Sequence, residues 1–220
     1  MRILLVNNSN MGGVEYYRMM MPNHILSLNN PEFEFTTVEG EILRHDELTK
    51  TSERVYNPAT KQTEVVMTSE KVSTDDYLKQ FDVIHFCRQI DIYGQTTIVD
   101  RLNRLGIPFG LDLDDYWHLP EYHIIYEDYK IYNTPQAVID SIKAAHFVTC
   151  TTPIIAREIE QYNKNVFVIE NGIDTNQESW QPDFVRKERL RFGFFQGATH
   201  FEDVMSCSQG VVELYRNKKY

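Results

Sequence analysis

Three carboxylates stand within four positions of the chain, at Asp112, Asp114 and Asp115. Carboxylates this close repel one another, so the cluster favours a partner that relieves the repulsion: a cation, a hydroxyl-rich ligand or a group of N–H donors. The apolar run before them, IPFGLDL (107–113), predicts a buried strand that ends at the cluster. Strand alternation places Asp112 and Asp114 on one face and Asp115 on the other. The alternative is that the aspartates cap the helix or loop that follows.

Two glycines near the N-terminus, Gly12 and Gly13, form the second candidate feature. They follow a short apolar run (3–6) typical of a buried strand, and apolar residues recur at helical spacing from 14 to 28. Glycines let the backbone approach a ligand closely, and a helix N-terminus attracts an anion. Without a GxGxxG frame, a plain tight turn fits the pair equally well. Pro22 within this helix removes a backbone hydrogen bond and predicts a kink.

Further candidate side chains lie close to these two features in the sequence. Glu15 and Arg18 lie near the start of the first helix, where Arg18 could meet a phosphate or Glu15, and a plain salt bridge is the simpler expectation. Arg88 follows an apolar strand and could bind an acidic ligand group. Trp117 and His118 follow the aspartates, and such rings either stack on sugars or pack on the sheet as an aromatic lid.

Strands and helices alternate along most of the chain. Short apolar runs are separated by stretches with helical periodicity, which predicts an α/β fold: a Rossmann-like, mostly parallel sheet with helices on both faces. The expected strands are 3–6, 33–37, 82–86, 107–113, 147–150 and 166–169, and the expected helices after the first are 95–105, 134–145 and 152–162. Ligands bind beyond the carboxyl ends of such strands. The candidate residues follow strands, so we expect them to converge on one edge of the sheet.

Two stretches interrupt this alternation. Residues 40–76 are polar, and two short runs flank Asn57-Pro58-Ala59-Thr60, which predicts an inserted surface hairpin. Near the C-terminus, an apolar run, a glycine turn at Gly197 and a helix over 203–215 repeat the order of the N-terminus, and one such unit cannot bury its own faces. The expected organisation is a first domain (1–172), a linker (173–189) and the first strand, loop and helix of an incomplete second domain (190–220).

Composition narrows the classes of function. The chain has 220 residues, of which 42% are hydrophobic, as in a globular protein with a core. Its net charge of -10 lacks the basic footprint of a nonspecific nucleic-acid binder, so no nucleic-acid partner is expected. Cys87, Cys150 and Cys207 are widely spaced and are interpreted as reduced, mostly buried thiols. No apolar run has the length of a transmembrane helix or a signal-peptide core, so the expected location is the cytoplasm.

The order of several short motifs resembles that of GT4-type glycosyltransferases, whose GT-B fold places two Rossmann-like domains across a cleft. The motifs are GGVE (12–15), DVIH (82–85), IP with an acidic end (107–115), AHFVTCTTPII (145–155), VIENGID (168–174) and FGFFQGATHFEDV (192–204). YYR with Pro22 (16–22) and DLDDYWHLP (112–120) resemble a narrower branch of this family. The resemblance spans most of the chain and rests on the order and spacing of the motifs.

The resemblance implies a role for each candidate residue. In this family the first domain binds the acceptor and carries a glycine loop near the reaction centre, and the second domain binds most of the donor nucleotide. The implied roles are catalysis for Asp114 and Asp115, donor binding for Gly12, Gly13 and Gly197, acceptor binding for Asp112, Trp117, His118, Arg88, Glu15 and Arg18, and a hinge at Asn171 and Gly172. One position departs from the family: aligned on Trp117, its usual histidine falls at Asp114, and a carboxylate cannot replace an imidazole that titrates near neutral pH.

The expected function is therefore one part of a retaining glycosyltransferase, which moves a sugar from a nucleotide-sugar donor to a hydroxyl of a carbohydrate or lipid-linked acceptor. The chain would supply the acceptor side and be inactive without a second-domain chain or a longer form. No cofactor is required, and a divalent metal on the donor diphosphate, bound by a DxD motif as in GT-A transferases, is not favoured. The alternatives are a non-catalytic carbohydrate- or protein-binding module and, more distantly, a HAD-like phosphatase with Asp112 as nucleophile.

Overall fold

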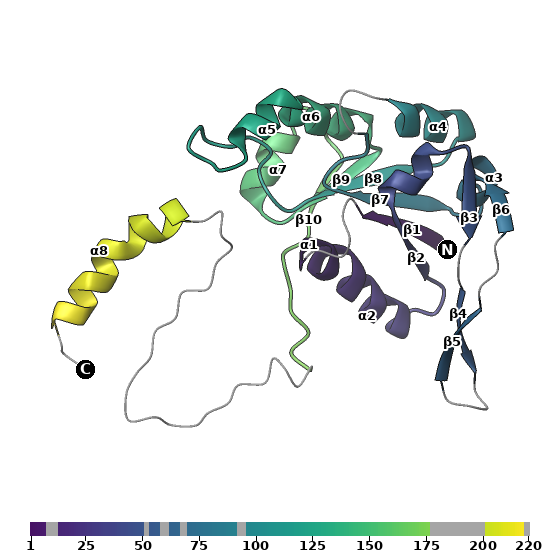
Figure 1. The fold of residues 1–220 in the computed structure, drawn as a ribbon, viewed down its shortest axis with the longest axis horizontal. Helices are drawn as coiled ribbons and strands as arrows, with labels where there is room; N and C mark the ends of the chain where they lie inside the picture. The colour runs from purple at the N-terminus through teal and green to yellow at the C-terminus, as the bar shows by residue number, and fades with distance from the viewer. Residues whose placement is uncertain are drawn as a thin grey trace. The chain divides into compact units, whose positions relative to one another are not determined.

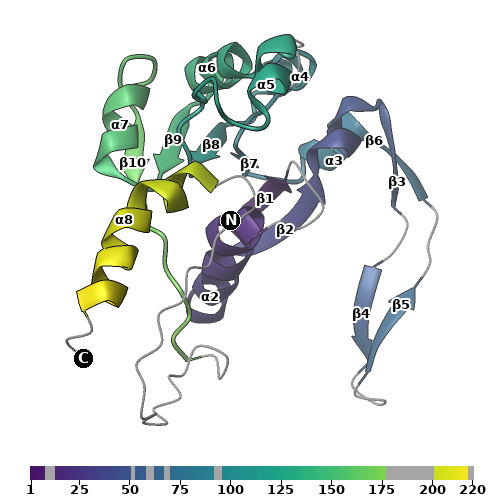
Figure 2. The same ribbon diagram turned by 60° about the vertical axis from the view of Figure 1, so that its left-hand side comes forward.

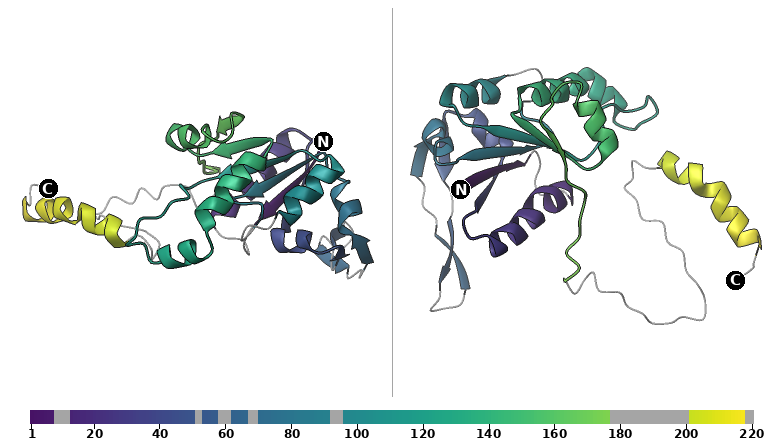
Figure 3. Two further views of the ribbon diagram at one scale, coloured as in Figure 1. Left: turned by 90° about the horizontal axis from the view of Figure 1, so that it is seen from above. Right: turned by 180° about the vertical axis from the view of Figure 1, so that it is seen from behind.

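The computed structural model describes residues 1–7, 13–50, 53–57, 62–66, 70–91, 96–176 and 201–217. It divides into two compact units, one formed by Met1–His118 with Tyr129–Ile173 and the other by Leu119–Asp128 with the described residues of Asp174–Tyr220. The second unit contains helix α8 (Phe201–Asn217), drawn in yellow in Figure 3, where a helix is expected over 203–215. The strand expected before it, and Gly197, lie outside the described residues. None of the helices in the described part of the chain has the length and apolar character needed to cross a membrane.

The first unit is built on a six-stranded parallel sheet (Figure 1). In spatial order its strands are β10 (Val166–Val168), β9 (Phe147–Cys150), β8 (Phe109–Leu113), β7 (Val83–Cys87), β1 (Arg2–Asn7) and β2 (Glu34–Glu39), and every adjacent pair is parallel. The predicted Rossmann-like α/β fold is confirmed. The chain runs from β1 to β2 in one direction and from β7 onward in the other, so the strand order reverses between β1 and β7. Open parallel sheets bind ligands at this reversal, beyond the carboxyl ends of the strands.

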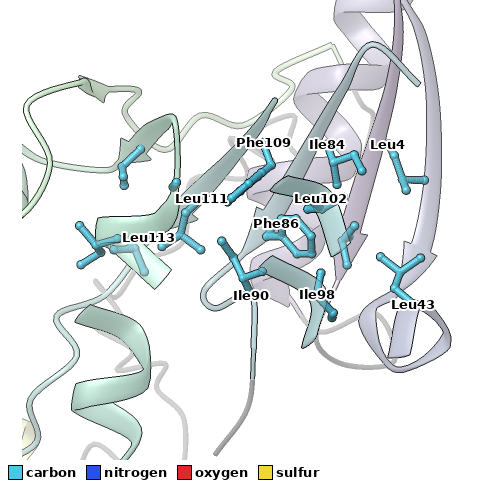
Figure 4. Packing of buried hydrophobic residues seen from close by; sticks show 14 of the residues in the cluster. Leu4, Leu43, Ile84, Phe86, Ile90, Ile98, Leu102, Phe109, Leu111 and Leu113 are labelled. Carbon is cyan, nitrogen blue, oxygen red and sulfur yellow. The ribbon is translucent and has the colours of Figure 1, made fainter. Parts of the chain in front are cut away.

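One face of the sheet carries the main apolar core. Alternate strand residues pack there against α3 (Thr74–Leu78), α4 (Thr97–Leu105), α6 (Thr134–Ala144) and α7 (Pro153–Ile159). Figure 4 shows part of this packing, including Leu4, Ile84, Phe86, Phe109 and Leu111 from the three neighbouring strands β1, β7 and β8. Because this face is apolar along β8, the intervening residue Asp112 points to the opposite face of the sheet.

The first helix packs on that opposite face and contains a π-helical segment. α1 (Gly13–Glu15) continues into η1 (Tyr16–Met20) and then into α2 (Met21–Asn29). Met19 of η1 is fully buried against Leu5 and Cys87 of the sheet. The helix therefore lies over β1 and β7, next to the reversal of strand order.

Pro22 lies in the first turn of α2, directly after the π-helical segment. Proline lacks the N–H that a helix interior needs, and its ring crowds the carbonyl four residues earlier. Here the N–H of Met21 bonds to the carbonyl oxygen of Tyr16 in a wider turn, and Pro22 occupies a position where a helix start needs no N–H. The disturbance expected at Pro22 takes the form of this π segment, and Arg18 lies within it.

The expected insertion contains two antiparallel ladders (Figure 2). β4 (Glu53–Asn57) pairs with β5 (Gln62–Val66), which confirms the predicted hairpin. β3 (Glu47–Lys50) pairs with β6 (Glu70–Ser73) in a second ladder that the sequence pattern does not predict. The 3-10 helix η2 (Gly40–Arg44) precedes both ladders.

Buried Arg101 attaches the start of this insertion to α4. Its guanidinium donates to the carbonyl oxygens of Leu43 and His45 at 3.0 and 2.8 Å, and it pairs with Asp46 at 2.6 Å. Three positions of the insertion are thereby held to one helix. The short remaining helix of the described chain, α5 (Tyr126–Ile131), follows the loop after β8.

Helix α4 ends at Leu105, where the predicted helix 95–105 also ends, and the next residue, Gly106, has a left-handed φ of 69°. We predict that Gly106→Ala lowers the free energy of unfolding by about 1 kcal/mol, because a Cβ disfavours this conformation. Gly106→Asn is the matched control and should lose less, because asparagine tolerates left-handed φ values better. Urea denaturation followed by circular dichroism measures both variants. Equal losses in the two variants would contradict the assignment.

Candidate functional site

A buried ion pair between Arg18 and Asp112 joins the first helix to the sheet. Arg18 Nε donates to Asp112 Oδ2 at 3.0 Å and Nη2 donates to Oδ1 at 2.6 Å, with the side chains 4% and 3% exposed. Burial disfavours the charged guanidinium, but the hydrogen bond and the charge of Asp112 outweigh it and raise the pKa of Arg18. This two-pronged geometry is the one in which arginine binds a carboxylate most strongly.

Asp112 is also hydrogen-bonded across the sheet. It faces Thr149 in the parallel register of β8 and β9, and Thr149 Oγ1 donates to Asp112 Oδ1 at 2.5 Å. The same hydroxyl lies 3.3 Å from Nε2 of His85 on β7. Burial lowers the pKa of His85 and favours its neutral form. Both carboxylate oxygens of Asp112 are therefore occupied from within the fold, and Thr149 is a partner that only the strand register could have indicated.

Arg18 also binds the segment that leaves the sheet after β10. Its Nη1 donates to the carbonyl oxygen of Ile169 at 2.6 Å and to Oδ1 of Asn171 at 3.2 Å. In Figure 1 this segment, drawn in green, passes the start of the first helix. Asn171 and its exposed neighbour Gly172 are the hinge residues that the family resemblance implies. The sequence indicated Glu15 as the salt-bridge partner of Arg18, whereas the structure pairs Arg18 with Asp112.

Arg88 lies in a strained turn at the carboxyl end of β7. Its φ is 68°, and the N–H of Gln89 bonds across it to the carbonyl oxygen of Cys87 at 2.9 Å, a γ-turn hydrogen bond. The N–H of Arg88 itself donates to the carbonyl oxygen of Asp112 at 2.8 Å, which ties the turn to β8. Strained backbone of this kind costs on the order of 1–3 kcal/mol and clusters at ligand sites. This turn adjoins the reversal of strand order.

The Arg88 side chain binds the two remaining aspartates. Its Nε and Nη2 donate to the two carboxylate oxygens of Asp114, both at 2.9 Å, and Nη2 also lies 3.3 Å from Asp115 Oδ2. The hydrogen bond to Asp114 is the main cause of a raised pKa for Arg88. The side chains of Arg88 and Asp115 are 44% and 79% exposed, so this second cluster meets solvent whereas the first does not.

The acidic cluster is thus divided between two arginines. Of the partners expected for it, the structure provides N–H donors, from the guanidinium groups of Arg18 and Arg88. The predicted alternation does not extend beyond Leu113, because β8 ends there and Arg88 binds both Asp114 and Asp115. The sequence placed these carboxylates at the correct edge, but the pairing separates buried Asp112 from Asp114, which is 11% exposed, and from Asp115, which is 79% exposed.

Polar groups at the carboxyl end of β1 extend this edge. Asn7 is 3% exposed, and its Oδ1 has no hydrogen-bond partner among the residues that the structure describes. The register of β1 and β7 places Asn7 beside the end of β7. Glu15 is buried at the start of the first helix, and Gly13 has open space where a Cβ would stand. Gly12 lies outside the described residues.

The two aromatic candidates lie in different environments. Trp117 is 4% exposed and packs in the main core, 6.4 Å from Tyr162 between ring centroids. His118 is exposed, and its ring lies 5.4 Å from that of half-exposed Tyr116. In this position Trp117 has no ring face open to a sugar, and the packing alternative describes it. His118 remains open to a ligand.

Cysteine chemistry is not supported at this edge. Burial first, and then the nearby carboxylates of Asp112 and Glu15, raise the pKa of Cys87 to about 12, so its thiol stays protonated at neutral pH. Cys150 is also buried, whereas Cys207 is exposed. Within the described ranges, no three His, Cys, Asp or Glu side chains are grouped as a metal ion would need.

The two clusters differ in burial, so their aspartates should differ in their contribution to stability. We predict that Asp112→Asn lowers the free energy of unfolding by about 3–5 kcal/mol, because Arg18 is then left buried without its counter-charge. Asp115→Asn is the matched control at an exposed position and should change it by less than about 1 kcal/mol. Chemical denaturation at pH 7 measures both variants, and comparable losses would contradict the difference.

Comparison with known proteins gives one kind of match. No family model matches the sequence, and no curated protein matches it. Among solved structures, the chain is similar to an alpha-glucosyltransferase in complex with UDP-glucose and DNA containing an abasic site, with a TM-score of 0.40 and 12% sequence identity. The match covers 79% of this chain and 43% of the other, so this chain spans less than half the length of that glycosyltransferase.

Proposed function

We propose that this chain is part of a retaining glycosyltransferase of the GT4 type and supplies the acceptor side of its active site. The observation that carries the proposal is the gathering of Arg88, Asp114 and Asp115 at the carboxyl edge of a parallel sheet, beside the reversal of strand order. The family's motifs imply reactive groups at this same edge. The reaction moves a sugar from a nucleotide-sugar donor to a hydroxyl of a carbohydrate or lipid-linked acceptor.

Sugar transfer needs charge stabilised in two places, at the departing diphosphate and at the anomeric carbon, which becomes oxocarbenium-like. Arg88 suits the first, because a guanidinium binds phosphate oxygens and its Nη1 makes none of the bonds to Asp114 and Asp115. The two aspartates suit the second, because carboxylates stabilise positive charge and accept hydrogen bonds from sugar hydroxyls. We therefore assign catalysis to Asp114 and Asp115.

Donor contacts are assigned to the glycine turn and to Asn7. Gly13 leaves room for a close approach of the donor, and Gly12 and Gly197 keep the roles that the family resemblance implies. The buried Oδ1 of Asn7 would be satisfied by a hydroxyl of the bound sugar. The proposal requires no cofactor and does not favour a divalent metal. A second domain, in a longer form or in a partner chain, supplies the remaining donor contacts.

Acceptor contacts are assigned to His118, which is exposed, whereas Glu15 is 3% exposed and is assigned no contact with the acceptor. Asp112, Arg18 and Trp117 are buried within the fold, and the first two are bonded to each other. These three residues therefore position the edge of the sheet rather than contact the acceptor.

A non-catalytic carbohydrate- or protein-binding module is the second candidate function. One observation favours it: Asp114 and Asp115 are both paired with Arg88, and such a paired cluster can bind polar ligands without chemistry. A HAD-like phosphatase is not favoured, because its nucleophile would be Asp112, whose oxygens are bonded to Arg18 and Thr149.

Calorimetric titration with UDP-glucose, GDP-mannose and the corresponding free sugars tests the proposed site. We predict that at least one of these ligands binds, and that Arg88→Met and Asp114→Asn each weaken its binding about tenfold or more through the loss of a charge-assisted hydrogen bond. Asp140→Asn, which changes an exposed carboxylate of α6, should leave the affinity unchanged.

Assays of sugar transfer on the same samples distinguish a glycosyltransferase from a non-catalytic binding module. We expect no transfer by the chain alone and transfer once a second-domain chain or a longer form is supplied. Turnover of a nucleotide sugar by the isolated chain would contradict the assignment of an acceptor-side half. Affinities that do not change in the Arg88 and Asp114 variants would contradict the site itself.

A further inference from the structure

Arg18 holds three parts of the first unit at once: its own helix, β8 and the segment after β10. We propose that Arg18 is a positioning residue that fixes the path of the chain from Ile169 to Ile173, where it leaves the sheet, with Asn171 as the second anchor. The hydrogen bonds involved all lie within the first unit. The proposed role does not depend on the glycosyltransferase function.

The Arg18 side chain spans much of the carboxyl edge of the sheet. Its helix follows β1, whereas Ile169 follows β10 at the outer edge, and three strands lie between β1 and β10. Strands hydrogen-bond only to their neighbours, so the backbone ladders cannot join these two parts directly. The guanidinium joins them because it bonds both to Asp112 on the intervening strand β8 and to residues 169–173, called here the exit segment.

The exit segment has few other anchors. The N–H of Ile169 donates to the carbonyl oxygen of Cys150 at 2.8 Å, which continues the pairing of β10 with β9 by one residue. Residues 170–173 are exposed, and within the described part of the chain none of their backbone groups bonds to the sheet. Together with the bond from Ile169 to Cys150, the two bonds from Arg18 Nη1, to Ile169 and Asn171, hold this segment against the rest of the first unit.

Only an arginine can satisfy this arrangement. Nε and one hydrogen of Nη2 bind Asp112, which leaves both hydrogens of Nη1 for the segment. A lysine ammonium has three donors at a single point and cannot hold two separated sites. Asp112 is equally necessary, because without it the guanidinium is an unpaired buried charge. A substitution of Asp112 should therefore also loosen the exit segment.

Amide hydrogen exchange measured by NMR tests this role at single-residue resolution. The Ile169 amide reports on the segment, and the Ile84 amide, which bonds to Pro108 in the sheet, is the internal reference. We expect Asn171→Leu to accelerate exchange of Ile169 about fivefold or more relative to Ile84, because an anchor of the segment is lost. Asn171→Asp keeps an oxygen acceptor for Arg18, so in this variant the Ile169 amide should exchange at the wild-type rate or more slowly.

Arg18→Lys provides the second comparison, with an expected acceleration of about tenfold at Ile169 relative to Ile84. If this variant fails to fold, the Asn171 pair decides, because Asn171 is exposed and its replacement leaves the ion pair of Arg18 with Asp112 intact. Equal acceleration in the Asn171→Leu and Asn171→Asp variants, or unchanged exchange of Ile169 in the Asn171→Leu variant, would overturn the proposal.

Discussion

The carboxyl edge of this sheet depends on one buried ion pair, Arg18 with Asp112. Removing two charges from water costs several kcal/mol per ion, so the pair is stable only if its geometry is good and its remaining atoms are bonded. Both conditions hold, because the pair is two-pronged, Thr149 donates to the carboxylate, and Ile169 accepts from the guanidinium. This requirement fixes the first helix, strands β8 and β9 and the exit segment in one arrangement.

The second arginine is held in a different way. Arg88 is 44% exposed, and its ion pair with exposed Asp115 contributes little, although its bidentate pair with Asp114, which is 11% exposed, contributes more. The backbone bond from Arg88 to Asp112 also anchors the turn, and the buried pair fixes the position of Asp112. The buried pair of Arg18 and Asp112 thus forms a rigid inner cluster. It supports an outer cluster of Arg88, Asp114 and Asp115, whose side chains can exchange partners. In the proposed reaction, the outer arginine exchanges a carboxylate for a phosphate while the backbone beneath it stays in place.

The parallel sheet could be predicted because strands buried on both faces leave continuous apolar runs in the sequence. The end of α4 could be predicted because glycine, here Gly106, is the residue type that most readily adopts the left-handed conformation found there. The pairing of β3 with β6 could not, because ELTK and EKVS are polar and carry no clear alternation. The edge that gathers the candidate residues followed from the topology alone. Which arginine binds which aspartate did not, because the partners lie 94 and 26 residues apart and only side-chain geometry decides between them.

A double-mutant cycle on Arg18 and Asp112 tests most directly whether their pair is the central constraint. Arg18→Met and Asp112→Leu each remove one charge, and the double variant removes both, with the free energy of unfolding measured by chemical denaturation. We expect the double variant to recover much of what either single variant loses, with a coupling energy of about 2 kcal/mol or more, because neither charge is then left buried alone. Losses that simply add would contradict this expectation.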